Sequence, residues 1–222
     1  KNSGMVHISR DSRKITAADI ETVGNIARNL SLPENRLILH SVSQYYAVDG
    51  QCHVINPEGM EGEVLSQTML IIHGEATPIQ NLLNAVEDVP VKVCDAAFSA
   101  LCAGLAVLSP EQKTAGVAVL DLGAGTTGYI AYANRVLACA GSIGVGGDHV
   151  TNDIVSGLRL PHAMAEQLKV EYGSAVPRPA YRHRVVSLPA DGAFPERNIR
   201  LSDLDAITHA RLDELLRWIR AD

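Results

Sequence analysis

Apolar residues recur along this chain with two spacings, one typical of helices and one typical of strands. In residues 16–30 the apolar positions follow a helical period, and Thr16 stands three positions before the acidic Asp19, as in a helix cap. Apolar spacing and cap residues predict further helices at residues 79–87, 149–157, 161–172 and 202–219, and a helix rich in small residues is expected at 96–108. Short apolar runs between turn residues predict strands at 5–9, 37–43, 45–48, 64–73, 91–93, 117–121, 129–133 and 136–142, and a strand with a loop within 177–198.

The order of these elements predicts an α/β protein that begins with a separate small module. Residues 1–89 alternate strands with two helices, which is typical of a compact α+β domain. Residues 117–142 give three consecutive strands, a meander at the edge of a sheet. Asp148 and Ser202 stand where helix N-caps are expected, and Gly173 stands where a C-cap is expected.

The strand at 117–121 runs into an acidic residue and then a loop rich in glycine and threonine, Asp-Leu-Gly-Ala-Gly-Thr-Thr-Gly at 121–128. Glycines let backbone N–H groups approach phosphate oxygens, threonine hydroxyls add donors, and Asp121 can hold a hydrated Mg²⁺ through its waters. No Gly-Lys-Ser/Thr follows and the chain continues as a strand, so this is neither a P-loop nor a dinucleotide-binding loop. The pattern predicts a hairpin that grips phosphate. The alternative is a tight hairpin in which Gly and Thr serve only the turn geometry.

Two further motifs allow the same chemistry without requiring it. The glycine cluster at 144–147 opens a predicted helix, whose N-terminus attracts anions, but the same pattern is found in ordinary capping. Glu166 and Lys169 lie three positions apart on one predicted helix. They either reach a ribose together or form a surface ion pair, and their spacing fits both readings.

Composition and charge limit the function classes that remain. The chain has 46% hydrophobic and 20% charged residues, as in a globular protein, and its net charge of −6 argues against a nucleic-acid-binding protein. Residues 176–222 carry eight Arg and seven acidic residues, so this Arg-rich end either meets an acidic peptide or is a solvated face. The four cysteines lie far apart without a Cys-x-x-Cys motif, which is typical of reduced thiols in a cytoplasmic protein. The longest apolar run, 96–108, is too short to cross a bilayer.

No catalytic constellation stands out in the sequence. The eight His residues lack the spacing of metal ligands, and no Gly-x-Ser-x-Gly elbow occurs. Metal-centre and hydrolase interpretations are therefore disfavoured, and no catalytic residue is predicted.

Several motifs occur together in a fixed order: Asp-Leu-Gly-Ala-Gly-Thr-Thr at 121–127, Gly-Gly-Asp at 146–148 and Ala-Glu-x-x-Lys-x-x-x-Gly-x-Ala at 165–175. This combination resembles the superfamily of actin, heat-shock chaperone and sugar-kinase ATPases. The first half carries His-x-x-x-Gln-x-Tyr-x-x-Asp at 40–49 and Asn-Pro-x-Gly-Met-x-Gly at 56–62. Within that superfamily, these two segments resemble the FtsA family of bacterial cell-division proteins.

The resemblance implies an actin-like (ribonuclease H-like) ATPase fold with an inserted α+β domain of the FtsA type, called SHS2. Its implied domains are the inserted interaction domain at 1–89, the end of the first large domain at 90–113, the start of the second large domain at 114–150, and a small companion subdomain at 151–222. The absence of an initiator Met before Lys1 leads us to expect a central piece of a longer chain.

The resemblance also implies ligands and the residues that hold them. ATP with Mg²⁺ is expected, with the metal at Asp121, and binding is expected to be weak or absent without the rest of the protein. The phosphate contacts carry over to Asp121, Gly123, Ala124, Gly125, Thr126 and Thr127 with Gly147, and the ribose contacts to Glu166 and Lys169. Arg211, in Arg-x-x-Glu-Leu-Leu, is the expected contact for the acidic C-terminal tail of the tubulin-like protein FtsZ.

The implied function is a scaffold that links FtsZ filaments to the membrane at the septum. Self-association into filaments is expected, as are contacts of residues 1–89 with other division proteins. The expected location is the inner face of the cell membrane, reached through a segment outside this chain, and no nucleic-acid partner is expected.

One departure and two alternatives accompany this interpretation. Many relatives have Asp after the threonine pair where this chain has Gly128, so at most weak ATP hydrolysis is expected. The alternatives are a phosphotransferase of the sugar- or acetate-kinase type and an actin-like assembly factor of a pilus or secretion system. A kinase requires a general base for its substrate, and no carboxylate other than Asp121 is a candidate.

Overall fold

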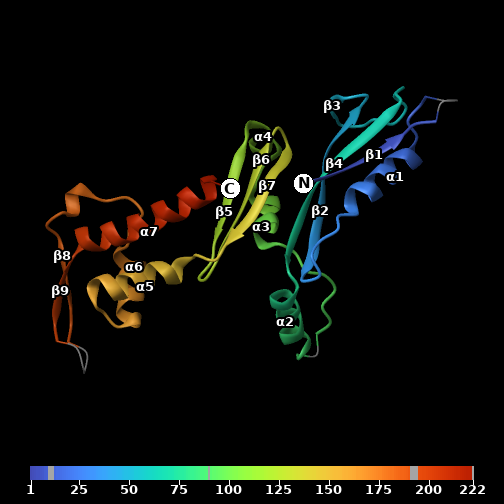
Figure 1. The fold of residues 1–222 in the computed structure, drawn as a ribbon. Coiled ribbons are helices and arrows are strands. Elements are labelled where there is room, and N and C mark those ends of the chain that lie inside the picture. Colours follow the sequence, from blue (N-terminus) through green and yellow to red (C-terminus); the bar gives the residue numbers. More distant parts are fainter. Residues whose placement is uncertain (10–12, 90, 191–194, 222) are drawn as a thin grey trace. The chain divides into compact units, whose positions relative to one another are not determined.

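The computed structural model describes residues 1–9, 13–89, 91–190 and 195–221 (Figure 1). The chain divides into two compact units. The first consists of residues 1–120 and 129–141, and the second of residues 121–128 and 142–222.

A four-stranded antiparallel sheet forms the first part of the first unit (Figure 1). Its strand order is β1-β4-β2-β3, with β1 at Asn2–His7, β2 at Arg36–Val48, β3 at Gln51–Val54 and β4 at Val64–Glu75. The strands predicted at 37–43 and 45–48 are one strand, β2, whose pairing with β4 shifts at Ile38/His40 and at Ser43/Tyr45. These β-bulges interrupt the alternation of apolar residues, which explains why the sequence pattern indicated two strands.

Helix α1, Ala17–Arg28, covers this sheet with its apolar face. Its N-cap is Thr16, whose hydroxyl accepts from the Asp19 N–H while the Asp19 carboxylate accepts from the Thr16 N–H. The predicted cap is therefore confirmed. The helix buries Val23 and Ala27 completely, and Gly4 of β1 lies so close beneath it that a Cβ there would overlap the α1 backbone.

Three short helices follow the sheet. They are α2 at Ala76–Glu87, α3 at Ser99–Val107 and α4 at Pro110–Ala115. Helix α2 buries none of its residues, whereas α3 buries Ala100, Leu101 and Gly104. The strand predicted at residues 91–93 is wrong, because these residues form no strand in the structure. None of the described strands pairs with them, and an apolar run becomes a strand only where it hydrogen-bonds to a neighbouring strand.

The predicted meander is present as a three-stranded sheet of order β5-β6-β7. Its strands are β5 at Val117–Leu122, β6 at Thr127–Ala133 and β7 at Val136–Ile143. Asn134 and Arg135 both have positive φ, as the tight turn between β6 and β7 requires. Ile130 and Leu137 of this sheet form one apolar cluster with Ala100 and Leu101 of α3.

Three α-helices, a 3₁₀ helix and a two-stranded sheet make up most of the second unit (Figure 1). They are α5 at Gly147–Leu158, α6 at His162–Tyr172, the 3₁₀ helix η1 at Pro179–Tyr181, the antiparallel strands β8 at Val185–Leu188 and β9 at Arg197–Arg200, and α7 at Leu201–Ala221. Helices α5, α6 and α7 share one core with β9, centred on the fully buried Ile154, Leu201 and Leu204. The strand and loop predicted within 177–198 are η1, β8 and the start of β9, while residues 191–194 lie outside the described part.

Two predicted N-caps in this unit are wrong. Helix α5 begins one residue before Asp148, with Gly146 as its N-cap, and α7 begins at Leu201, directly after β9 and ahead of Ser202. Asp148 and Ser202 are residue types that often cap helices, but here each lies inside the first turn. The sequence alone does not distinguish these two positions. The C-cap predicted at Gly173 is confirmed.

A buried ion pair fixes the chain between α6 and α7. Arg178 donates from its backbone N–H, Nε and Nη2 to Asp205 of α7, whose side chain is 2% exposed. Nη2 of Arg178 also donates to the Tyr172 carbonyl at the end of α6.

Among the described residues, no helix is long and apolar enough to span a bilayer.

Candidate functional site

The loop between β5 and β6 is a tight turn with one unpaired carboxylate at its entrance. The Gly123 N–H donates to the Thr126 carbonyl at 2.9 Å, which closes the turn. Asp121, the last acidic residue of β5, is half-buried and has no hydrogen-bond or ion-pair partner among the described residues. A partly buried carboxylate without a protein partner is suited to an ion or a bound ligand.

The N-terminus of α5 holds this loop in place. The N–H groups of Gly147 and Asp148 donate to the carbonyls of Gly123 and Ala124, each at 2.9 Å. The Thr127 hydroxyl donates to the Val145 carbonyl at 2.7 Å, and Thr127 is completely buried. The two glycine-containing motifs of the sequence are therefore one structural unit.

Some donors of the two motifs already have partners within the protein. Because its proton is committed to Val145, the Thr127 hydroxyl is not available to donate to a phosphate in this structure. The first N–H groups of α5 bind loop carbonyls instead of pointing to an anion. The hydroxyl of Thr126, in contrast, is exposed and makes no hydrogen bond with another described residue.

The glycines of the site differ in what the fold requires of them. A Cβ on Gly146 would overlap the carbonyl oxygens of Gly123 and Ala124, so the contact between loop and helix needs glycine there. A Cβ on Gly125 would meet nothing within 4 Å, and the φ of Gly125 lies outside the left-handed region. The hairpin geometry alone therefore does not explain the glycine at position 125.

Glu166 and Lys169 of α6 form an ion pair, one of the two arrangements that their spacing allowed, and they also contact α5. Lys169 Nζ lies 2.7 Å from Glu166 Oε2 and donates to the Thr151 hydroxyl at 2.8 Å. The Thr151 hydroxyl in turn donates to Glu166 at 2.5 Å, and Lys169 Nζ also reaches the Gly147 carbonyl at 3.1 Å. The hydrogen bonds from Lys169 and then Thr151 hold the pKa of the Glu166 carboxyl below its usual value. The pair is thus joined, through Gly147, to the helix end that supports the loop.

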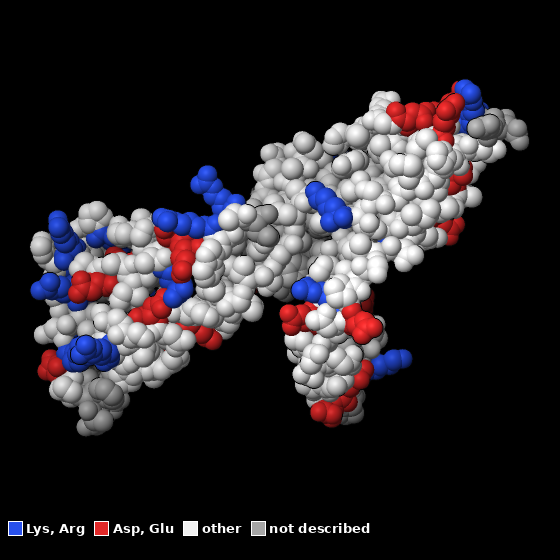
Figure 2. Space-filling view, in the orientation of Figure 1, with Lys and Arg blue, Asp and Glu red and all other residues white. Residues whose placement is uncertain are grey.

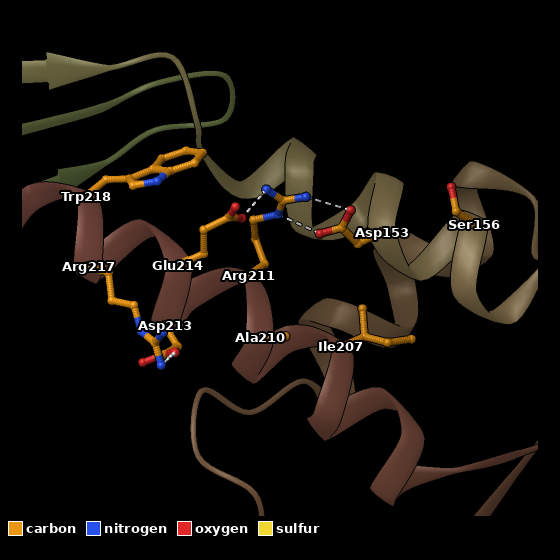
Figure 3. A pocket seen from close by; sticks show the side chains of 9 residues that line it. All are labelled: Asp153, Ser156, Ile207, Ala210, Arg211, Asp213, Glu214, Arg217 and Trp218. Carbon is orange, nitrogen blue, oxygen red and sulfur yellow. Dashed lines mark hydrogen bonds and ion pairs between the residues drawn. The ribbon is translucent and has the colours of Figure 1, made fainter.

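Arg211 of α7 lies in a separate pocket of about 610 Å³ (Figure 3). Its guanidinium donates through Nε and Nη2 to both carboxylate oxygens of Asp153 on α5, at 2.6 and 2.9 Å, and through Nη1 to Glu214 at 2.6 Å. These carboxylates raise the pKa of Arg211, with the Asp153 hydrogen bonds as the largest cause. The pocket is lined by Asp153, Ser156, Ile207, Ala210, Arg211, Asp213, Glu214, Arg217 and Trp218.

Sequence reasoning missed two residues that bind the candidate site residues. Thr151 links Glu166 with Lys169, and Asp153 neutralises Arg211 across 58 positions of sequence. Both lie on α5, two positions apart and therefore on different sides of the helix, and only the packing of α5 against α6 and α7 brings them to their partners. No local pattern in the sequence carries that information.

Comparison with known proteins identifies both halves of the chain. A family model described as "Cell division protein FtsA" matches residues 118–219, and one described as "SHS2 domain inserted in FTSA" matches residues 1–73. The Cell division protein FtsA of Pseudomonas aeruginosa is 30% identical over 221 residues, covering 100% of this chain and 53% of that protein. The Bacillus subtilis protein of the same name is 30% identical over 217 residues, covering 98% of this chain and 49% of that protein. The chain thus spans about half the length of these relatives.

A solved structure supports the fold class. MreB5 of Spiroplasma citri bound to ADP superposes with a TM-score of 0.53 at 19% identity, covering 67% of this chain and 47% of that one. Together with the SHS2 match, this confirms the prediction of an actin-like ATPase fold with an inserted α+β domain.

Proposed function

Since this chain belongs to the FtsA family of cell-division proteins, we propose that it is part of an ATP-binding, actin-like scaffold that links FtsZ filaments to the membrane at the septum. In the complete protein, nucleotide binding would favour self-association into filaments. Residues 1–89 would contact other division proteins, and the protein would lie on the inner face of the cell membrane.

One observation supports the nucleotide part of the proposal: the same loop contains Asp121, a carboxylate without a partner among the described residues, and Gly125, which has free space around its Cα. A carboxylate at the strand end is placed to hold the waters of Mg²⁺, and a position without a side chain leaves space for phosphate oxygens to approach the backbone. No group of three or more His, Cys, Asp or Glu side chains able to hold a metal occurs in the described part of the chain. This fits Mg²⁺, which keeps several waters and binds through one or two carboxylates with substrate phosphates.

The other residues expected at the nucleotide site fall into two groups: those free to contact the nucleotide and those that hold the loop in place. The exposed hydroxyl of Thr126 and the backbone of Gly123–Gly125 are our candidates for phosphate contact, while Thr127 and Gly147 support the loop. Glu166 and Lys169 are our candidates for ribose contact. Glu166 retains acceptor capacity, whereas the three N–H donors of Lys169 already face Glu166, Thr151 and the Gly147 carbonyl, so Lys169 would exchange one of these partners for a ribose oxygen. With Gly128 after the threonines and no second acid in the loop, we propose binding with slow hydrolysis at most.

The partner part of the proposal concerns the Arg211 pocket. Its charged lining contains three acidic side chains and two arginines, so the unoccupied pocket is slightly acidic. An acidic FtsZ tail would therefore bind by exchange, with a tail carboxylate taking the place of Asp153 on the Arg211 guanidinium. Trp218, 45% exposed at the pocket wall, offers an apolar surface for the tail (Figure 3).

A titration of an FtsZ tail peptide against the full-length protein tests this contact. Replacing Arg211 with Glu reverses the charge at the proposed anchor and should weaken binding by about tenfold or more, because a charge-assisted pair contributes roughly 1.5–3 kcal/mol. Arg220→Glu is the matched control, since Arg220 is exposed on the same helix and outside the pocket. Equal affinity of the two variants would discard the role of Arg211.

A further inference from the structure

A second pocket of the second unit carries an excess of arginine that the proposed function does not use. It has a volume of about 370 Å³ and lies where the end of α5 meets β9 and the start of α7. Arg159, Arg197 and Arg200 line it, and Asp203 is its one acidic lining residue. Its charge balance is therefore opposite to that of the Arg211 pocket.

Arg197 is held in a fixed position inside this pocket. Its Nη1 donates to the carbonyls of Leu158 and Arg159, each at 2.9 Å, and thereby caps the end of α5. A guanidinium has five N–H donors, and those on Nε and Nη2 have no partner among the described residues. The group is thus ordered by the helix end and keeps donors for a second ligand.

The other two arginines are exposed and uncompensated. Arg159 ends α5 in a left-handed conformation with a φ of 52°, and Arg200 ends β9 opposite Val185. Neither side chain makes an ion pair or hydrogen bond with another described residue. Figure 2 shows Lys and Arg side chains around the end of this unit that carries β8 and β9, with acidic side chains between them.

We propose that this pocket binds an acidic peptide segment of a protein partner, with its carboxylates on the guanidinium groups of Arg159, Arg197 and Arg200. Arginine forks match carboxylates in geometry as well as in charge. Asn198 also lines the pocket, and its amide N–H₂ has no partner among the described residues, so it offers a donor to a peptide carbonyl.

The surroundings favour a short peptide over an extended polyanion. The protein carries a net charge of −6, and Asp203 lies in the pocket itself, so a nucleic acid or an anionic bilayer would meet repulsion beyond the three arginines. A recess of this size admits side chains, whereas a bilayer surface is flat. This assignment gives a role to the Arg-rich end of the sequence and does not depend on nucleotide binding or on Arg211.

Fluorescence anisotropy with a labelled oligoglutamate peptide and the full-length protein tests the proposal. Arg159→Glu and Arg200→Glu should each weaken binding by about fivefold to tenfold, and the double variant by more, because each removes one pairing and adds one repulsion. Arg220→Glu makes the same charge reversal on an exposed residue outside both pockets and should bind like the wild type. Measuring the Arg159 and Arg200 variants in an Arg211→Glu background removes any binding of the peptide at the proposed FtsZ site, and the same loss of affinity is expected there.

Controls distinguish the other outcomes. If the charge reversals lower the melting temperature, Arg159→Gln and Arg200→Gln provide milder variants that should still weaken binding. Equal peptide affinity of the double variant and Arg220→Glu would overturn the proposal. Tighter binding of duplex DNA or of phosphatidylserine vesicles than of the peptide, lost in the same arginine variants, would also overturn it.

Discussion

At the scale of single residues, burial decides how much a charged pair contributes. The Asp205 side chain is 2% exposed and accepts three N–H groups of Arg178, whereas Asp213 is 41% exposed and pairs with an Arg217 that is 76% exposed. Removal of one partner from a buried pair leaves an uncompensated charge, but an exposed charge is solvated by water.

Asp205→Ala should therefore destabilise the protein far more than Asp213→Ala. We expect a loss of about 3–5 kcal/mol in the free energy of unfolding for Asp205→Ala and about 0.5 kcal/mol or less for Asp213→Ala. Urea denaturation of the two variants and the wild type measures both values. Similar losses would mean that Arg178 and Asp205 do not form the pair described.

Glu166 gives a pH dependence of stability with a defined sign. Hydrogen bonds from Lys169 and Thr151 hold its pKa in the folded protein below the unfolded value of about 4.3. Its contribution is therefore fully present above that value and disappears as the pH falls through the folded pKa. At neutral pH, Glu166→Gln should cost at most about 1 kcal/mol, since the Glu166 side chain is 41% exposed, and the cost should vanish in acid. Urea denaturation of both proteins at several pH values tests this, and a difference that persists in strong acid would contradict it.

At the scale of elements, the sequence predicted helices better than their ends. The capping pattern at Thr16 identified the start of α1 correctly, because both halves of the reciprocal cap lie within four consecutive residues. The starts of α5 and α7 were misplaced because neither helix begins at a capping side chain. The N-cap of α5 is Gly146, and α7 follows β9 directly. The bulges of β2 are set by its pairing with β4, a tertiary feature that local patterns do not contain.

The cap of α1 allows a comparison within one helix. Thr16→Ala removes the hydroxyl that accepts from the Asp19 N–H and should cost about 1 kcal/mol in the free energy of unfolding. Thr22→Ala changes the same residue type inside the helix, where the exposed hydroxyl only bonds back to Ala18, and should be neutral or slightly stabilising. Thermal unfolding monitored by circular dichroism ranks the variants, and the reverse order would contradict the capping role.

At the scale of the whole molecule, motifs in a fixed order identified the family, while packing defined the sites. The loop at 121–128 and the glycines at 144–147 were recognisable separately, but their union through Gly123 and Gly147 is visible only in the fold. The same holds for Asp153, which occupies the guanidinium that the sequence had assigned to a partner. The candidate site residues could therefore be predicted where they lie in a continuous family motif. Their contacts across α5, α6 and α7 could not be predicted, because they depend on how these helices pack.

The central claim, that the β5–β6 loop binds Mg²⁺ and ATP, is tested most directly by isothermal titration calorimetry of the full-length protein with Asp121→Ala. Because Asp121 has no partner among the described residues, its replacement should leave folding unchanged and lower the affinity for Mg·ATP by about tenfold or more. Asp213→Ala, an acid removed elsewhere in the same unit, should bind Mg·ATP like the wild type. An Asp121→Ala protein that is folded and binds Mg·ATP with unchanged affinity would contradict the claim.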